Sequence, residues 1–274
     1  GIIFISQMED DGLFPLNYTP GYSNAGIPAL HFSNNLADRV LSGVGWSREK
    51  IQKTMNRSLE SVSFIINDYI LDASVDLELI TTRCANVIGE IKSGNRKFRD
   101  EYVVLGAHFD HVGEGGVGSG SRKPDLLQVH PGADDNASGT SGLLEIAQKL
   151  AANKSRLKRS VLLIGFDAEE KGLLGSKYFM SNPTVDLNKI ITMINMDMIG
   201  RMKDSSATVG GVGSSPLFEP LIDSLKTDRS FNLSISSQGF GPSDHASFYS
   251  EDIPVLFFFS GIHDDYHTPN DTWK

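Results

Sequence analysis

The chain has 274 residues, of which 39% are hydrophobic, and it carries a formal net charge of -9 at pH 7. This length is enough for one large α/β core, or for a core with a smaller companion. The acidic balance argues against a nucleic-acid groove and against an anionic membrane surface as partner, because both need clustered Lys and Arg. We therefore expect small molecules or peptides as partners.

The single cysteine, Cys84, excludes an internal disulfide framework, so cysteine usage does not identify the redox compartment. The sequence has no apolar run long enough to span a bilayer. Because the first residue is Gly1 rather than Met, we expect a leading segment to have been removed, and the sequence itself leaves the localisation open.

The first part of the chain has its own composition. Residues 1–6 have the pattern of an apolar strand, and residues 15–28 are dense in Pro, Gly, Asn and Ser. We expect this part to be the end of a small β-rich module. A helical connection over residues 46–55 and a half-buried strand over residues 74–80 are predicted to follow.

After that, one pattern repeats: an apolar, β-rich run is followed by a polar cluster. We predict four such strands, over residues 101–106, 160–165, 190–194 and 253–261. Residues 141–154, between the first two, have the apolar spacing of a helix. Near-continuous apolar strands that alternate with helices predict an α/β fold, with a sheet covered on both faces. In open sheets of this kind, ligands bind beyond the carboxyl ends of the strands.

Acidic and histidine side chains gather at these predicted strand ends. His108 and Asp110 lie two residues apart, so on an extended chain both project to one face. A carboxylate so close could orient a metal-bound imidazole. The remaining candidates are Asp134 and Asp135 before the predicted helix, Glu169 and Glu170, Asp197, and His267 beside Tyr266.

Each cluster also has a plain structural explanation. The His-Asp pair could lie on a surface loop, and the paired aspartates could cap the following helix and stabilise its dipole. The paired glutamates could form a solvated turn, because Glu is almost always exposed. Asp197 could be a capping residue, and His267 could lie on an exposed loop. These separate explanations would all have to be true at once, at four successive strand ends of one sheet, whereas a single functional site would explain all the clusters together.

Two histidines with several carboxylates form a nitrogen and oxygen donor set suited to zinc, and carboxylates readily bridge two such ions. Of two adjacent glutamates, one can bind metal while its neighbour accepts a proton from metal-bound water. The sequence has no HExxH helix, serine elbow, P-loop or dinucleotide glycine fingerprint. The residues themselves therefore predict a metal-assisted hydrolase with one or two zinc ions.

Five motifs follow one another in an order that is characteristic of a known family. They are GAHFDHVG, PGADDNASG, FDAEEKGLLGS, NMDMIGR, and SDHASF with YHTPNDT. Over about residues 86–273, they resemble the M28 family of co-catalytic zinc aminopeptidases. The resemblance implies a phosphorylase/hydrolase-like fold, a three-layer α/β/α arrangement with a mixed, mostly parallel central sheet.

The same resemblance implies a domain organisation. Residues 1 to about 45, with GIPALHFS, resemble the tail of a protease-associated (PA) domain. We therefore expect a PA-like segment and linker over residues 1–55 and a zinc peptidase domain over residues 56–274. Domains of this family continue into a closing C-terminal helix, which we expect to be missing from this chain.

The resemblance further implies a role for each residue of a site with two zinc ions. The implied metal ligands are His108 and Asp197 for one zinc, Glu170 and His267 for the other, and Asp134 as a bridge to both. Glu169 would be the general base, and Asp110 would orient His108. Asp135, beside the bridging aspartate, matches a position where the family commonly has a cis peptide bond.

Three more residues match the family without a place among the metal ligands. Tyr266 is a candidate donor to the oxyanion of the transition state. Asp244 and His245 would lie behind the metal ligands or in the wall of the substrate site.

The implied function is removal of N-terminal residues from peptides with a free N-terminus, with Glu169 as the acceptor of a proton from metal-activated water. Alternatives on the same fold are a zinc carboxypeptidase and a glutaminyl cyclase. An alternative of another class is a non-catalytic, receptor-like binding module. A secreted or periplasmic location is suggested by the resemblance alone.

Overall fold

The computed structural model describes residues 1–5, 27–67, 69–76, 82–225 and 232–274. The chain divides into two compact units, Gly1–Thr81 and Thr82–Lys274. This division falls later in the chain than the boundary that we expected after residue 55. The strand predicted over residues 74–80 lies mostly outside the described residues, and its first three residues are not part of a strand.

The first unit contains a short parallel sheet and two helices. Its elements are β1 (Ile2–Ile5), β2 (Ala29–Phe32), α1 (Asn34–Ser42) and α2 (Arg48–Ser58). Ser33 and Ser47 cap the two helices, because each side chain accepts a backbone N–H of the first turn. α2 confirms the helix predicted over residues 46–55. The likeness of this unit to a PA domain stays a prediction.

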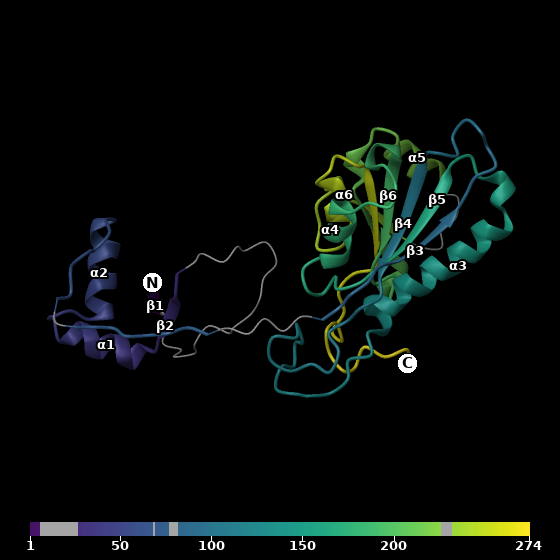
Figure 1. The fold of residues 1–274 in the computed structure, drawn as a ribbon. Helices are drawn as coiled ribbons and strands as arrows, with labels where there is room; N and C mark the ends of the chain where they lie inside the picture. Colours follow the sequence, from purple (N-terminus) through teal and green to yellow (C-terminus); the bar gives the residue numbers. More distant parts are fainter. Residues whose placement is uncertain (6–26, 68, 77–81, 226–231) are drawn as a thin grey trace. The chain divides into compact units, whose positions relative to one another are not determined.

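The second unit is built on a seven-stranded sheet with the strand order β3-β5-β4-β6-β9-β7-β8 (Figure 1). The strands are β3 (Val87–Ile91), β4 (Tyr102–His108), β5 (Ser160–Phe166), β6 (Ile190–Met196), β7 (Ser206–Gly210), β8 (Asn232–Ile235) and β9 (Val255–Phe259). β3 is antiparallel to β5, and β7 is antiparallel to β9, while all other neighbours are parallel. The sheet is therefore mixed and mostly parallel, as predicted, and β4, β5, β6 and β9 are the four predicted strands.

Helices cover both faces of this sheet. They are α3 (Gly139–Ala152), α4 (Leu174–Ser181), α5 (Phe218–Leu225) and α6 (His245–Tyr249), with a π-helical turn η1 (Ala133–Ser138) and the 3₁₀ turns η2 (Lys154–Arg156), η3 (Leu187–Lys189), η4 (Lys203–Ser205) and η5 (Val212–Ser214). Val104 of β4 packs with Phe179 of α4 and Phe248 of α6. The next residue, Leu105, packs with Leu143 of α3, because successive strand residues point to opposite faces. The unit is a three-layer α/β/α fold.

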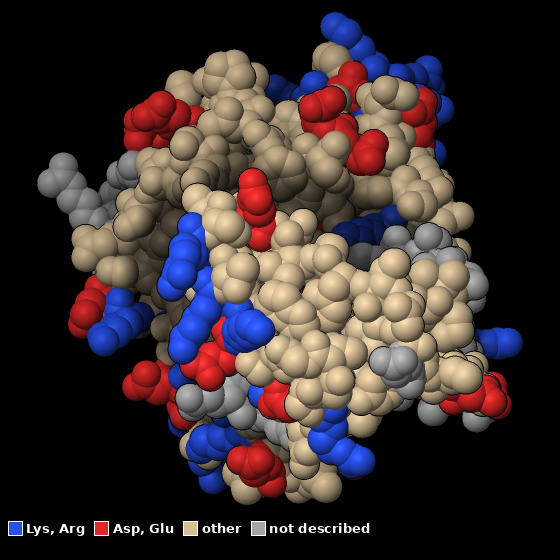
Figure 2. Space-filling model, turned by 90° about the vertical axis from the view of Figure 1, so that its left-hand side faces the viewer, with Lys and Arg blue, Asp and Glu red and all other residues tan. Residues whose placement is uncertain are grey.

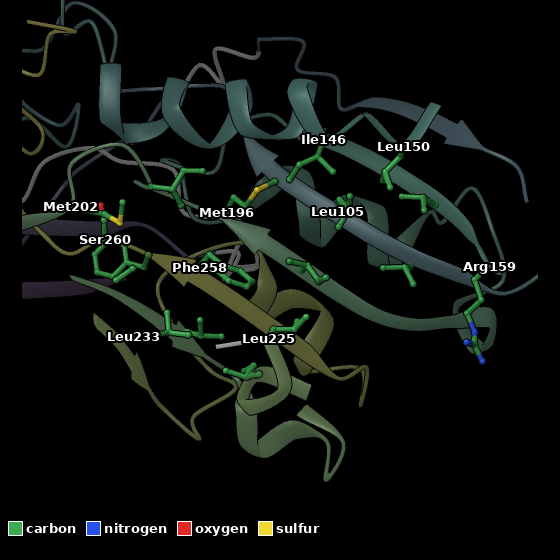
Figure 3. A pocket seen from close by; sticks show the side chains of 18 of the residues that line it. Leu105, Ile146, Leu150, Arg159, Met196, Met202, Leu225, Leu233, Phe258 and Ser260 are labelled. Atoms are coloured by element: carbon green, nitrogen blue, oxygen red, sulfur yellow. The ribbon is translucent and has the colours of Figure 1, made fainter. Parts of the chain in front are cut away.

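An apolar groove lies on the sheet face that carries α3 and α5. It has a volume of about 1310 Å³. Its lining includes Leu105, Met196 and Phe258 of the strands, Ile146 of α3 and Leu225 of α5 (Figure 3). Because apolar surface in contact with water costs about 25 cal/mol per Å², this groove favours contact with apolar groups.

Figure 2 shows charged side chains of both signs between wide uncharged areas. Among the described residues, no helix has both the length and the apolar character needed to span a bilayer.

Candidate metal centre

The predicted site residues meet at one edge of the central sheet. β4, β5 and β6 are neighbouring parallel strands, so their carboxyl ends lie side by side. His108 is the last residue of β4, Glu169 and Glu170 follow β5, and Asp197 follows β6. His267 comes from the segment after β9. The fold therefore brings residues from four strand ends to one place.

Two groups of possible metal-binding atoms form at this edge. In the first group, His108 Nε2 lies 3.3 Å from Asp135 Oδ1 and 3.4 Å from Asp197 Oδ1. All three of these residues are buried. The first group therefore offers one imidazole and two carboxylates.

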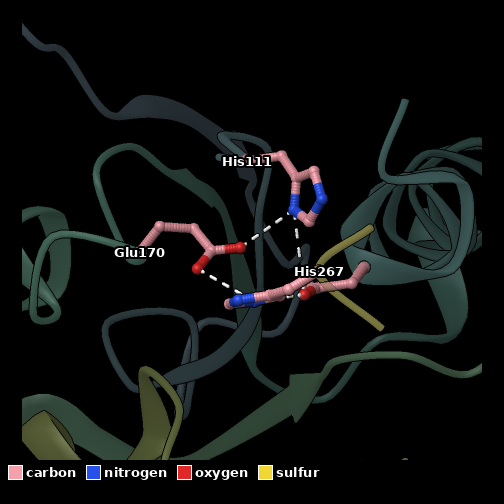
Figure 4. A group of neighbouring side chains, drawn as sticks. His111, Glu170 and His267 are labelled. Carbon is pink, nitrogen blue, oxygen red and sulfur yellow. Dashed lines mark hydrogen bonds and ion pairs between the residues drawn. The ribbon is translucent and has the colours of Figure 1, made fainter. Parts of the chain in front are cut away.

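The second group contains His111, Asp135, Glu170 and His267. His267 Nε2 lies 3.0 Å from Asp135 Oδ2 and 3.1 Å from Glu170 Oε2. His111 Nδ1 lies 2.9 Å from Glu170 Oε1, so that both imidazoles point at one carboxylate (Figure 4). Asp135 belongs to both groups, through Oδ1 in the first and Oδ2 in the second.

The shared carboxylate is that of Asp135, whereas we expected Asp134 in this position. Asp134 is buried too, but its Oδ1 accepts the Gly200 backbone N–H at 2.7 Å, and its Oδ2 lies 3.4 Å from His263 Nε2. Both aspartates belong to η1, but the helical backbone is broken at Asp135, where φ is -106° and ψ is 92°, and only Asp135 reaches both groups of metal-binding atoms. The expected cis peptide bond joins Asp135 and Asn136.

The residues present fit divalent cations. His108 Nε2 and Asp197 Oδ1 are buried without a hydrogen-bond partner among the described residues, although only 3.4 Å separates them. The carboxylates of Asp135, Glu170 and Asp197 gather around the same two positions. Buried anions are costly unless cations balance them. Imidazole nitrogens and carboxylate oxygens are ligands that zinc prefers.

The imidazoles respond to the same excess of negative charge. Burial opposes protonation of His108, but Asp110 and Asp135 raise its pKa well above the usual value. Burial also opposes protonation of His267, whereas Asp135 and Glu170 raise its pKa to about 10. The carboxylates therefore favour positive charge at this site, which a bound cation would supply.

Asp110 holds the backbone of the paired glutamates. Its carboxylate accepts the N–H groups of Glu169 at 2.9 Å and Glu170 at 3.2 Å. The same carboxylate lies 3.6 Å from His108 Nδ1, which is closer, at 3.1 Å, to the backbone oxygen of Asp110. The side chain that we expected to orient His108 therefore also fixes the direction of the two glutamates.

Asp271 holds the paired aspartates in the same way. It is fully buried, and its carboxylate accepts the N–H groups of Asp134 and Asp135, each at 3.1 Å. Arg201 Nη2 lies 3.5 Å from Asp271 Oδ1. We did not predict a role for Asp271 from the sequence, although the motif YHTPNDT contains it. Its carboxylate binds backbone N–H groups, and these occur in almost every residue, so no particular side chain elsewhere in the sequence points to it.

Glu169 belongs to neither group of metal-binding atoms. It is buried, and burial raises the pKa of its carboxyl to about 9, with an opposing effect of His108. The carboxylates of Asp244 and Asp197 add to the rise. A cation bound beside Glu169 would favour the carboxylate form, which is the form that accepts a proton.

The three remaining candidates lie around the metal-binding groups. The Tyr266 ring stacks on the His267 ring, with 3.8 Å between the ring centroids. Asp244 is fully buried, and burial raises its pKa to about 7. His245 stacks on Phe257, and burial lowers its pKa to about 4. None of the three candidates belongs to the two groups formed by the described residues.

His111 was not identified from the sequence. It stands in the motif GAHFDHVG, three residues after His108, and the motif already supplied a histidine and an aspartate for the site. Its ring reaches the second group because the chain leaves the strand after His108. The direction of a side chain beyond a strand end depends on the path of the loop, which periodicity does not predict.

Comparison with known proteins now identifies the family. The model of a family described as peptidase family M28 matches residues 86–274. The chain belongs to peptidase family M28. It is 30% identical over 185 residues to a probable leucine aminopeptidase 2 from Arthroderma benhamiae, a match that covers 64% of this chain and 33% of the relative.

Two other matches extend the comparison. The chain is 28% identical over 272 residues to an aminopeptidase from Pseudomonas aeruginosa, a match that covers 95% of this chain and 43% of that protein. A zinc aminopeptidase from Bacillus subtilis has a similar structure, with a TM-score of 0.54 and 28% identity, over 68% of this chain and 44% of that one. The M28 chain therefore spans less than half the length of each of these proteins.

Proposed function

We propose that the chain is a zinc-dependent aminopeptidase that removes residues from the free N-terminus of peptides. The observation that carries the proposal is the position of Asp135, whose two carboxylate oxygens face two separate groups of metal-binding atoms. The names of the aminopeptidase relatives and of the zinc aminopeptidase with a similar structure support the same activity.

The metal-binding residues divide between two ions. His108 and Asp197 would hold one zinc, Glu170 and His267 the other, and Asp135 both. When bound, the two cations supply a Lewis acid for the scissile carbonyl and lower the pKa of water. The protein provides fixed positions for these charges, because their ligands come from the ends of neighbouring strands.

Glu169 is proposed as the general base. Its carboxylate would accept a proton from the attacking water and then deliver that proton to the leaving amine. The bond from its backbone N–H to Asp110 would hold the carboxylate in one direction during both transfers. Donation from the Tyr266 hydroxyl to the developing oxyanion remains a prediction.

The proposal is tested with two peptides that differ only at the N-terminus. The zinc-loaded chain is incubated with an unstructured peptide and with its N-acetylated twin, and the products are followed by mass spectrometry. Stepwise loss of residues from the free N-terminus alone is expected. Release from the C-terminus would instead indicate a carboxypeptidase, and formation of a cyclic N-terminal residue a cyclase. If neither peptide changes while zinc is bound, the proposed activity is wrong.

A further inference from the structure

The second group has four side chains that could bind a metal ion, and the first has three. We propose that His111 is a metal ligand of this chain, so that one metal position has four protein donors and the other has three. This inference rests on the proposed two-metal site. It adds a residue to that site and makes the two positions unequal.

Four separations outline the four-donor position. His111 Nδ1 lies 2.9 Å from Glu170 Oε1 and 3.7 Å from Asp135 Oδ2. His267 Nε2 lies 3.0 Å from Asp135 Oδ2 and 3.1 Å from Glu170 Oε2. Ligand atoms about 2.0–2.1 Å from a tetrahedral zinc are about 3.3–3.4 Å from one another. The observed separations lie on both sides of that value, and one donor atom from each of the four side chains lies within 4.8 Å of the other three, so the group can close around one zinc ion.

The His111 ring is held in this position by its surroundings. Its side chain is only 10% exposed. Gly132 lies directly against the ring: a Cβ atom at Gly132 would stand 2.7 Å from His111 Cγ, and the backbone there has a φ of 61°. Only glycine satisfies both conditions. A side chain at position 132 would therefore displace this ring.

The two nitrogens of His111 have different surroundings. Nε2 is buried and has no hydrogen-bond partner among the described residues, whereas Nδ1 points at the carboxylates of Glu170 and Asp135. With its proton on Nε2, the ring presents a free electron pair at Nδ1. This is the form in which neutral imidazole binds a metal.

The first position differs because its described protein donors are three: His108, Asp135 and Asp197. Metal sites closed by four protein ligands are generally structural, whereas catalytic sites keep a position for water or substrate. We infer that the open position is the one at His108, and that the ion held by His111 and His267 binds more tightly.

The direct test counts the histidines bound to each ion. The chain is loaded with NMR-active cadmium, and proton–cadmium correlation spectra are recorded for the wild type and for His111→Gln. Gln keeps a hydrogen-bonding group near Glu170 but removes the imidazole. In the wild type, one cadmium signal should couple to ring protons of two histidines and the other to those of one. In His111→Gln, each signal should couple to one histidine.

A second measurement uses zinc affinity. His111→Gln should lower the affinity of one of the two sites by more than the roughly 10–100-fold that loss of an outer hydrogen bond costs. The matched control is His130→Gln. The His130 ring centroid lies 6.4 Å from that of His111, and its ring nitrogens contact Ser121 and Gln128 instead of the site. This control should bind both ions as the wild type does.

The outcomes separate this inference from the proposed function. If the wild type binds two ions and no cadmium signal couples to His111, the inference is overturned while the two-metal site stands. If the wild type binds fewer than two ions, the two-metal site itself is wrong and the inference fails with it. Loss of one histidine coupling in His111→Gln, with both couplings kept in His130→Gln, would establish His111 as a ligand.

Discussion

Asp271 accepts the backbone N–H of Asp135 at 3.1 Å, and thereby links the segment that carries His267 to the carboxylate shared by both groups. Asp271→Asn should weaken zinc binding by about 10–100-fold, because one acceptor oxygen becomes an NH₂ group that faces backbone donors. The affinity is measured by competition with a chelator. Asp265→Asn is the control, since Asp265 pairs with the same Arg201 at 2.7 Å. Equal losses in both variants would contradict a specific role of Asp271.

Glu169→Gln should lower turnover by about 10²–10⁴-fold, because the amide cannot accept the proton. The zinc content should stay that of the wild type, since Glu169 belongs to neither group of metal-binding atoms. Peptide hydrolysis and metal analysis are carried out on the same samples. Glu170→Gln serves as the comparison and should lose zinc. A Glu169→Gln variant that keeps its activity would rule out Glu169 as the general base.

Asp244→Asn should change how the stability of the metal-free chain depends on pH. Burial raises the pKa of Asp244 in the folded chain to about 7, above the unfolded value of about 3.9. Its stabilising effect is therefore complete below about pH 4 and is lost as the pH rises toward about 7. In this window, the wild type should lose up to about 1.4 kcal/mol per pH unit more than the variant. Urea unfolding at several pH values measures the difference, and parallel curves would contradict the prediction.

Removal of metal should lower the melting temperature. The carboxylates of Asp135, Glu170 and Asp197 lose their balancing cations when a chelator is added. Zinc at about a hundred times its Kd stabilises the folded chain by about 2.7 kcal/mol per site. For a unit of this size, we expect a difference of roughly 5–10 °C in Tm per site. Calorimetry before and after addition of zinc to the chelated protein measures it, and an unchanged Tm would argue against tight zinc binding.

The apolar groove between α3 and α5 should bind the fluorescent dye ANS in the folded protein. Leu225→Lys should reduce the ANS signal, because Leu225 lines the groove. Its side chain is 68% exposed, so the free energy of unfolding should change by less than about 0.5 kcal/mol. The matched control is Leu217→Lys, since Leu217 is 74% exposed and is not part of the groove lining. Equal ANS signals in the two variants would place the dye elsewhere.

The general position of the site could be predicted from the sequence. Burying charged residues at the end of an apolar strand costs free energy unless they bind a partner such as a cation. Parallel strands bring their carboxyl ends to the same edge of a sheet. We predicted His108, Glu170, Asp197 and His267 in this way and by resemblance, and the structure brings them to the same edge of the sheet. The fold class followed from the same strands, whereas the edge strands were not predicted, because β3 and β8 are short and half exposed.

The details that depend on the direction of a side chain could not be predicted. Asp134 and Asp135 have the same chemistry and adjacent positions, so only the path of the backbone decides which one faces the histidines. In the same way, the direction of the His111 ring depends on the path of the loop after β4. Asp271 accepts hydrogen bonds from backbone N–H groups, and the sequence does not show which of these groups will lie near it.

The link between Asp271 and Asp134 spans 137 residues of sequence. Closing so long a loop has a large entropic cost, which the packing of the strands between the two residues has to offset first. We therefore expect the central sheet to form before these two segments meet. If so, bound zinc should act mainly by slowing the unfolding of the chain.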